Sequence, residues 1–286
     1  MAVRTCSRLA MGIFFVILFS SFLYQEKITW IAIGDSITYL NEHADETGGR
    51  VSKGYMTRVV DKLPEISYVN QGHNGWTARG IADKIDSLGL ESADIYTILL
   101  GTNDWWQGLP IGTLQDYRSA SGSSTIYGSF RIIIDKLRKL NPSAKIVLMT
   151  PMKRTDFVYM GNFHNKAYGS YQLKNGQWLQ DVAKAIIDIG KHEKLPVVDL
   201  FNNKQFSYKR LVKFKRLKDS TTNSYRNFTY PEYTKIPFNP DDTEYPYPEE
   251  SIDLTYDGLH PSDVGNEIIA NELVKCFRKI GLLRNR

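Results

Sequence analysis

The chain of 286 residues carries a formal charge of +5, with 42% hydrophobic and 23% charged residues. This composition is typical of a globular protein with a buried core, and so modest a net charge gives no argument for nucleic-acid binding. The five histidines and two cysteines show no metal-ligand spacing, so the sequence indicates neither a metal nor another cofactor. We expect one α/β domain in residues 26–286, whose oligomeric state the sequence leaves open.

Residues 1–25 have the pattern of a targeting segment. Arg4 and Arg8 precede a mostly apolar stretch, residues 9–23. A positively charged start followed by such a stretch is typical of a secretory signal peptide. The stretch is short for a membrane-spanning helix, which needs about 20 apolar residues, but no Ala-x-Ala cleavage signal is present. We therefore predict export to the periplasm, cell surface or medium, through a cleaved signal peptide or a retained signal anchor that would be the protein's one membrane contact.

Five short apolar segments are candidates for strands. They are rich in Ile, Val and Leu and alternate little with polar residues, as is typical of strands covered by helices on both faces. These segments are residues 29–33, 67–70, 95–100, 145–150 and 196–199.

Segments with a helical pattern lie between and after the strand candidates. They are residues 55–63, 77–88, 126–140, 177–192 and 262–280. Strands that alternate with helices predict a parallel sheet with right-handed crossovers. We therefore predict a three-layer α/β/α sandwich around a parallel five-stranded sheet of flavodoxin-like order.

The tripeptide Gly34-Asp35-Ser36 directly follows the first predicted strand. This position places the Ser36 hydroxyl at the carboxyl edge of the sheet, where open α/β proteins bind their ligands. The tripeptide alone has a second interpretation, because Asp and Ser are favoured residues at a helix N-cap.

Three further polar blocks follow in order: Asn70-Gln-Gly-His-Asn-Gly75, Gly101-Thr-Asn-Asp104 and Asp257-Gly-Leu-His-Pro261. Each has a simple structural interpretation by itself, since Asn-Gly is a turn signal and loop Asn and His residues are common. Their joint occurrence after predicted strands favours a common site.

Together the four blocks resemble the SGNH (GDSL-type) hydrolase family, over about residues 31–270. The resemblance implies that Ser36 is a nucleophile. It also implies that the backbone N–H groups of Ser36 and Gly75 and the side chain of Asn103 donate hydrogen bonds to an oxyanion. Gly72 is a less favoured register for the glycine donor.

The last block supplies the remaining groups that this chemistry needs. A serine hydroxyl is a poor nucleophile without an adjacent base. His260 suits that role, because an imidazole with an ordinary pKa of about 6.5 can take and return a proton. Asp257, three residues earlier, can fix the imidazole tautomer. The family resemblance assigns the same two residues to the triad.

Residues 201–256 have no counterpart that we can match, and substrate choice is expected to depend on them. The run of lysines and arginines at 204–218 predicts either a solvated face or a patch for an acidic polymer, such as a uronic-acid polysaccharide. The many aromatic residues of this stretch indicate an ordered excursion, which we expect to pack across the sheet edge near Ser36.

Three residues are predicted to contact the substrate: Asp35, Trp105 and Trp106. The two tryptophans directly follow Asn103 and offer a flat aromatic surface to a sugar ring or an acyl chain. The sequence thus predicts an exported serine esterase that deacetylates an O-acylated carbohydrate through an acyl-enzyme. The alternatives are a lysophospholipase or thioesterase, and a non-catalytic polysaccharide-binding protein on the same fold.

Overall fold

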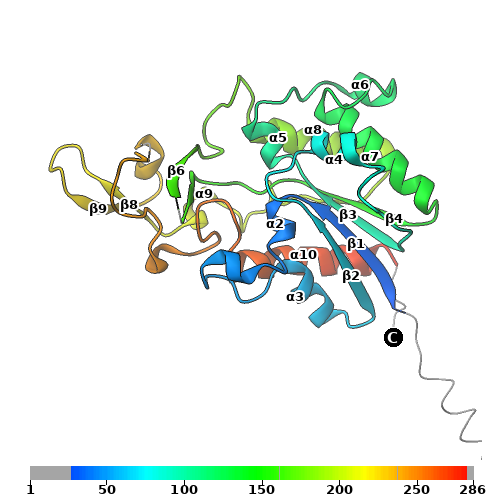
Figure 1. The fold of residues 1–286 in the computed structure, drawn as a ribbon, viewed down its shortest axis with the longest axis horizontal. Helices are drawn as coiled ribbons and strands as arrows, with labels where there is room; N and C mark the ends of the chain where they lie inside the picture. The colour runs from blue at the N-terminus through cyan, green and yellow to red at the C-terminus, as the bar shows by residue number, and fades with distance from the viewer. Residues whose placement is uncertain (1–26, 161, 237, 282–286) are drawn as a thin grey trace, which may run out of the picture.

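The computed structural model describes residues 27–160, 162–236 and 238–281 (Figure 1). The predicted targeting segment, residues 1–25, lies outside them. None of the helices in these ranges is both long enough and apolar enough to cross a membrane.

A parallel five-stranded sheet with the order β2-β1-β3-β4-β7 forms the centre of the molecule. This is the predicted flavodoxin-like order, and the prediction is confirmed. β3 is buried at every position, as expected for a strand covered on both faces. The strands are β1 (Ile28–Gly34), β2 (Ile66–Gly72), β3 (Ile95–Leu99), β4 (Lys145–Met149) and β7 (Val197–Val198).

Helices cover both faces of this sheet, which confirms the predicted three-layer sandwich (Figure 1). Each face has its own apolar core, one with Ile133 and Ile186 and the other with Trp30 and Phe277. The first face carries α4 (Ala78–Lys84), α7 (Ile126–Leu140) and α8 (Leu179–Glu193), and the second carries α3 (Tyr55–Lys62) and α10 (Asp263–Lys279).

Most predicted helices agree with the structure to within two residues, but α4 is shorter than the predicted 77–88. It begins after Thr77, whose side chain accepts a hydrogen bond from Gly80 N, and it ends at Lys84. Short elements fill the connections: α2 (Ser36–Tyr39), η1 (Ala44–Thr47), α5 (Thr102–Trp106), α6 (Leu114–Arg118), α9 (Tyr208–Leu211), η2 (Glu232–Lys235) and η3 (Glu249–Ser251).

The excursion at residues 201–256 forms a side lobe on the side of the sheet where β1 leads into α2, and of its described residues only Tyr256 lines the cavity that contains Ser36. It includes the hairpin of β8 (Lys215–Lys218) and β9 (Tyr225–Phe228), which extends away from the sheet in Figure 1. The side lobe shares a separate small core with Val158 of the segment after β4, and the other members of this core are Val212, Leu217, Phe228, Tyr233 and Tyr247.

The side lobe supports the chain segment that follows β4, residues 154–160. This segment contains β5 (Phe157–Tyr159), which pairs with β6 (Asn162–Ala167). Tyr245 OH donates to Val158 O at 2.8 Å, and Tyr247 OH donates to Asp156 O at 2.5 Å. Through these two tyrosines, the excursion at residues 201–256 holds the segment 154–160 in place.

The basic run at 204–218 does not form a continuous free surface. Lys215 is fully buried, and its Nζ donates to Asp156 Oδ2 at 2.6 Å and to the Tyr171 hydroxyl at 3.0 Å. Two other members of the run form ion pairs, Arg210 with Asp253 and Arg216 with Glu244. These contacts favour a structural role for the run over a patch for an acidic polymer.

Candidate active site

Ser36 lies where β1 ends, as the first residue of α2. Asp35 precedes it as the N-cap, and its Oδ1 accepts a hydrogen bond from Ile37 N at 3.0 Å. The strand places the serine at the carboxyl edge of the sheet, and the cap fixes the turn on which its hydroxyl stands.

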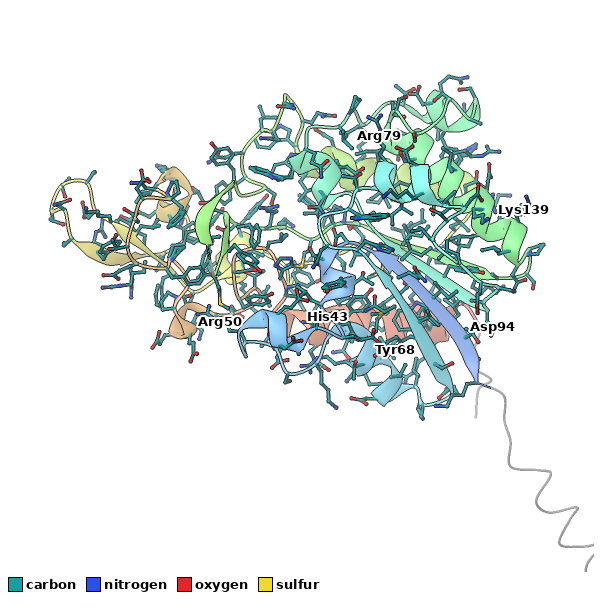
Figure 2. All side chains as sticks on the ribbon, viewed as in Figure 1. His43, Arg50, Tyr68, Arg79, Asp94 and Lys139 are labelled. Atoms are coloured by element: carbon teal, nitrogen blue, oxygen red, sulfur yellow. The ribbon has the colours of Figure 1, made fainter. Side chains whose placement is uncertain are left out.

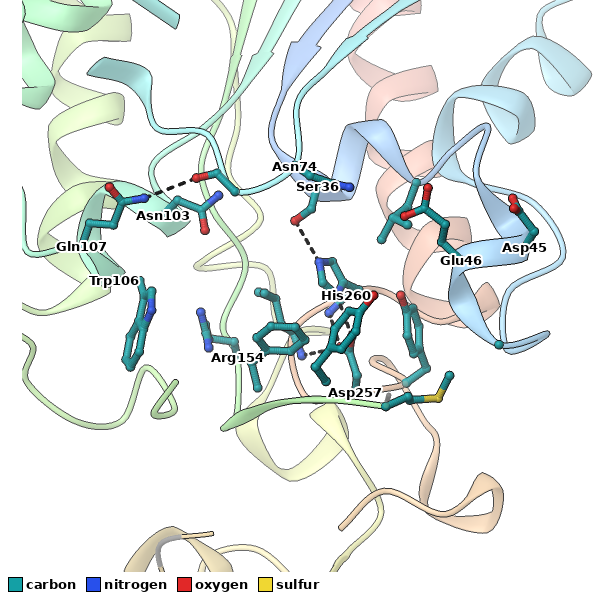
Figure 3. Close-up of a pocket in the computed structure, with 18 residues that line it drawn as sticks. Ser36, Asp45, Glu46, Asn74, Asn103, Trp106, Gln107, Arg154, Asp257 and His260 are labelled. Carbon is teal, nitrogen blue, oxygen red and sulfur yellow. Dashed lines mark hydrogen bonds and ion pairs between the residues drawn. The ribbon is translucent and has the colours of Figure 1, made fainter. Parts of the chain in front are cut away.

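The structure brings Ser36 together with Asp257 and His260, although Ser36 lies more than two hundred residues before them in the chain (Figure 3). His260 Nε2 lies 2.8 Å from Ser36 Oγ, and His260 Nδ1 lies 2.6 Å from Asp257 Oδ2. Because a carboxylate accepts hydrogen bonds, it holds the proton on Nδ1 and leaves the Nε2 lone pair for the serine hydroxyl. Such an arrangement can activate a hydroxyl for attack on a carbonyl carbon.

Asp257 is itself held rigidly by its own loop. Its Oδ1 accepts hydrogen bonds from Leu259 N at 3.0 Å and from His260 N at 2.7 Å. Asp257 and His260 are only 3% and 7% exposed, so the imidazole and the carboxylate meet away from bulk water. Burial strengthens their electrostatic contact.

The loop that carries Asp257 and His260 rests on the segment after β4. Thr155 N donates to Gly258 O at 2.9 Å, and Val158 N donates to Asp257 O at 3.2 Å. Gly258 has a φ of +89°, and a Cβ at this position would lie 2.0 Å from Asp156 O. Only glycine allows this close approach.

Gly75 and Asn103, the two further residues predicted to donate to an oxyanion, line the same cavity as Ser36. Figure 3 shows Asn103 there. Asn103 Nδ2 donates one hydrogen bond to Trp76 O at 2.9 Å, which orients the amide. Gly75 has a φ of +73°, a conformation that glycine adopts without cost. Gly72, the less favoured register, pairs with Gly34 between β1 and β2 and is not part of the cavity wall.

The cavity has a volume of about 580 Å³ and mixes polar and aromatic side chains. Its wall includes Trp106, one of the three residues predicted to contact the substrate. The other lining residues are Ser36, Leu40, Asp45, Glu46, Gly48, Asn74, Gly75, Asn103, Gln107, Arg154, Phe157, Tyr159, Met160, Tyr256, Asp257, Leu259 and His260.

Two predicted substrate contacts need correction, Asp35 and Trp105. Asp35 is 2% exposed because its carboxylate turns inward to cap α2. Trp105 is 1% exposed, and its Nε1 donates to Gln177 O at 3.0 Å. Neither side chain lines the cavity.

Sequence reasoning missed much of the cavity wall, above all residues 154–160. This segment follows the end of β4, so the carboxyl-edge rule that found the serine also points to it. Asp45 and Glu46 come from η1 on the other side of Ser36, and no motif marks them (Figure 3).

Burial shifts two carboxyl groups behind the cavity. It raises the pKa of Asp35 and the pKa of Asp104 to about 6, against the hydrogen bonds that each receives from backbone N–H groups. Asp104 is fully buried and accepts from Ala78 N at the start of α4. Among the described residues, no group of three or more His, Cys, Asp or Glu side chains could hold a metal ion.

The family model described as "GDSL-like Lipase/Acylhydrolase family" matches residues 32–268. The chain belongs to this family. The resemblance drawn from the four sequence blocks is thereby confirmed, and this GDSL hydrolase is a carboxylic-ester hydrolase.

Solved structures agree with this assignment. This GDSL hydrolase is similar to a possible lipase from Chitinophaga pinensis, with 59% sequence identity, a TM-score of 0.88, and coverage of 90% of this chain and 100% of that chain. A Lactobacillus plantarum protein is 18% identical with a TM-score of 0.58, covering 90% of this chain and 99% of that chain. An acetyl xylan esterase is 20% identical with a TM-score of 0.51, and the match covers 87% of this chain and 99% of that chain. The last two show the shared fold alone. No curated protein matches the chain.

The raised pKa of Asp35 predicts a specific pH dependence of stability. The carboxyl group ionises near pH 6 in the folded protein and near pH 4 in the unfolded chain. The folded state therefore binds more protons between these values, and its stability falls as the pH rises through them. Asp35→Asn removes the ionisation and keeps the cap. The free energy of unfolding of the variant relative to the wild type should rise by up to about 3 kcal/mol between about pH 4 and 6.

Urea unfolding of both proteins at several pH values measures this difference. Comparison at equal pH cancels, to first order, the contributions of the other titrating groups. If the difference in the free energy of unfolding between the two proteins stays constant from pH 4 to 7, the pKa of Asp35 is not raised.

Proposed function

We propose that Ser36 is the nucleophile of this esterase, with His260 as its general base and Asp257 as the residue that orients the imidazole. The observation that carries the proposal is the continuous hydrogen-bonded path from Asp257 Oδ2 through both ring nitrogens to Ser36 Oγ. Attack of Oγ on the ester carbonyl transfers the serine proton to His260 Nε2. The imidazolium then protonates the leaving alcohol, and an acyl-enzyme remains.

Water resolves the acyl-enzyme by the same route in reverse. His260 takes a proton from water, the hydroxide attacks the acyl carbon, and the proton returns to Ser36 Oγ as the carboxylic acid leaves.

The oxyanion of both steps is to be stabilised by the backbone N–H groups of Ser36 and Gly75 and by Asn103 Nδ2. An amide nitrogen has two N–H donors, and Asn103 uses one of them on Trp76 O, which leaves the other for the substrate. Loss of one such donor typically costs about 3 kcal/mol of transition-state stabilisation.

The proposed substrate is an acetyl ester of a carbohydrate. Trp106 offers an aromatic face to a sugar ring, and polar side chains such as Gln107, Asp45 and Glu46 can bind hydroxyl groups. Contact of a long acyl chain with the carboxylates of Asp45 and Glu46 would be costly, which favours an acetyl group over the acyl chains of the lysophospholipase and thioesterase alternatives.

We also propose that the protein is exported. The support is the sequence pattern of residues 1–25, in which Arg4 and Arg8 precede an apolar stretch.

Ser36→Ala tests the nucleophile. The variant should lose hydrolysis of a short-chain aryl ester by about 10⁴-fold or more in kcat, because no other described group replaces the hydroxyl beside His260. Ser87→Ala, which removes an exposed serine hydroxyl at the end of α4, is the matched control and should keep wild-type activity. Circular dichroism checks that both variants fold. An active Ser36→Ala protein would refute the assignment, and an inactive wild type would favour the non-catalytic alternative.

A series of 4-nitrophenyl esters from acetate to laurate tests the acyl preference. We expect kcat/KM to be highest for acetate and to fall by about tenfold or more by eight carbons, because contact with the carboxylates of Asp45 and Glu46 disfavours a long apolar chain. Acetylated oligosaccharides should then release acetate. A kcat/KM that rises with chain length would favour the lipid alternatives.

Fusion of residues 1–26 to a reporter enzyme that is active only outside the cytoplasm tests export. We expect an active reporter, and an inactive one when the segment is omitted. Exchange of Arg4 and Arg8 for Glu should lower the reporter activity, because the positive start directs insertion. An inactive reporter in the intact fusion would contradict export.

A further inference from the structure

Arg154 is a buried cation in the wall of the cavity that the proposed mechanism does not use. Its side chain is 1% exposed, and the residue lies after β4 among the lining residues. Figure 3 shows its guanidinium between Trp106 and His260, below Asn103. It therefore stands beside the groups that we assign to the reaction.

The guanidinium makes few of the hydrogen bonds that it can make. Nε donates to Thr155 O at a long 3.4 Å, and Nη2 has no acceptor within the described part of the chain. The rings of Trp105 and Trp106 lie 5.8 and 5.6 Å from Cζ. They contact the guanidinium but do not accept hydrogen bonds from its N–H groups. Five N–H donors in a rigid plane remain largely unsatisfied.

The nearest carboxylates are committed to other donors. Asp156 accepts from Lys215 Nζ at 2.6 Å, from Gly169 N at 2.7 Å and from the Tyr171 hydroxyl at 2.7 Å. Asp257 accepts from the His260 ring and backbone, as described above. Arg154 forms no ion pair with a described carboxylate. Its charge is thus buried without a contacting carboxylate among the described residues.

A buried cation in this position destabilises the folded protein unless a bound ligand pairs with it. An unpaired buried charge destabilises a protein by several kcal/mol, and burial here lowers the pKa of Arg154 to about 10, which still leaves it protonated at neutral pH. An anionic group of the substrate would supply the missing acceptor.

We propose that Arg154 binds a carboxylate of the ester substrate, so that the enzyme prefers esters of acidic sugars over neutral ones. This inference rests on the proposed function and names the substrate class more closely. A planar guanidinium matches a carboxylate with two parallel hydrogen bonds. Arg154 is the one permanently cationic side chain among the described residues of the wall, which matches one negative charge better than a phosphate dianion.

The charges of the cavity are also separated in space. Arg154 and Trp106 lie on one side of Ser36 in Figure 3, and Asp45 and Glu46 lie on the other. A carboxylate at the Trp106 end avoids repulsion from these acids, while a sugar hydroxyl can meet them. The cavity thus orients an acidic sugar ester in one direction.

The test is the ratio of kcat/KM for matched acidic and neutral esters. One arm compares an O-acetylated uronic acid with its neutral O-acetylated sugar, and the other compares the mono-4-nitrophenyl ester of glutaric acid with 4-nitrophenyl pentanoate. The two arms place the carboxylate in the alcohol and in the acyl part. We expect the wild type to prefer the acidic ester by about 10- to 100-fold in the alcohol arm, the range of a charge-assisted hydrogen bond.

Variants assign this preference to the guanidinium. Arg154→Met should abolish it, and Arg154→Lys, which keeps the charge and loses the fork, should retain part of it. Lys174→Met is the matched control, because Lys174 Nζ also lies over the Trp106 ring, at 4.2 Å, but the residue does not line the cavity. It should keep the wild-type ratio.

Binding to the Ser36→Ala protein separates this proposal from the proposed function. Calorimetry with a free uronic acid and with the neutral sugar should show tighter binding of the acid, and Arg154→Met in the same background should remove the difference. This measurement holds even if the protein hydrolyses no ester. Equal wild-type kcat/KM for acidic and neutral esters in the alcohol arm, or an unchanged preference in Arg154→Met, would overturn the proposal.

Discussion

The site depends on the attachment of the loop that carries Asp257 and His260 to the segment after β4, to which two backbone hydrogen bonds contribute. Thr155 N binds Gly258 O at 2.9 Å and Val158 N binds Asp257 O at 3.2 Å. The sheet fixes Ser36 at the end of β1, but His260 comes from a loop far along the chain. Anchoring that loop to the segment after β4 helps to hold Nε2 at 2.8 Å from the serine oxygen. Catalysis by positioned groups tolerates little displacement, so this anchor decides whether the site is formed.

The side lobe in turn holds the segment after β4 in place. Asp156 stands at the centre, since its main-chain oxygen accepts from Tyr247 and its carboxylate accepts from the buried Lys215. Removal of the charge of Asp156 or of Lys215 would leave the other buried and unpaired, which typically costs about 3–5 kcal/mol of stability. The side lobe thus contributes a single described residue, Tyr256, to the cavity wall, yet it fixes the segment that carries Arg154.

Several ionisable groups around the site are buried, which disfavours their charged forms. Burial raises the pKa of Asp35 and of Asp104 to about 6, and Arg154 carries its charge without a carboxylate contact. Each arrangement reduces the stability of the folded state. The cap on α2 accounts for Asp35, and the contact with the start of α4 accounts for Asp104. Arg154 contacts two tryptophan rings but no described carboxylate, which is why a carboxylate of the substrate explains it best.

The sequence by itself determined the sheet, its order and the residues that meet at its carboxyl edge. Strand and helix patterns are local, and parallel strands deliver the residues after them to one edge, so Ser36 could be placed without coordinates. The tertiary structure alone decided which neighbouring side chains face the cavity. It buried Trp105 and exposed Trp106 to the cavity, turned Lys215 of the basic run inward, and brought Arg154 to the wall. Side-chain direction and burial depend on contacts between segments distant in the chain, and no local pattern of residues encodes those contacts.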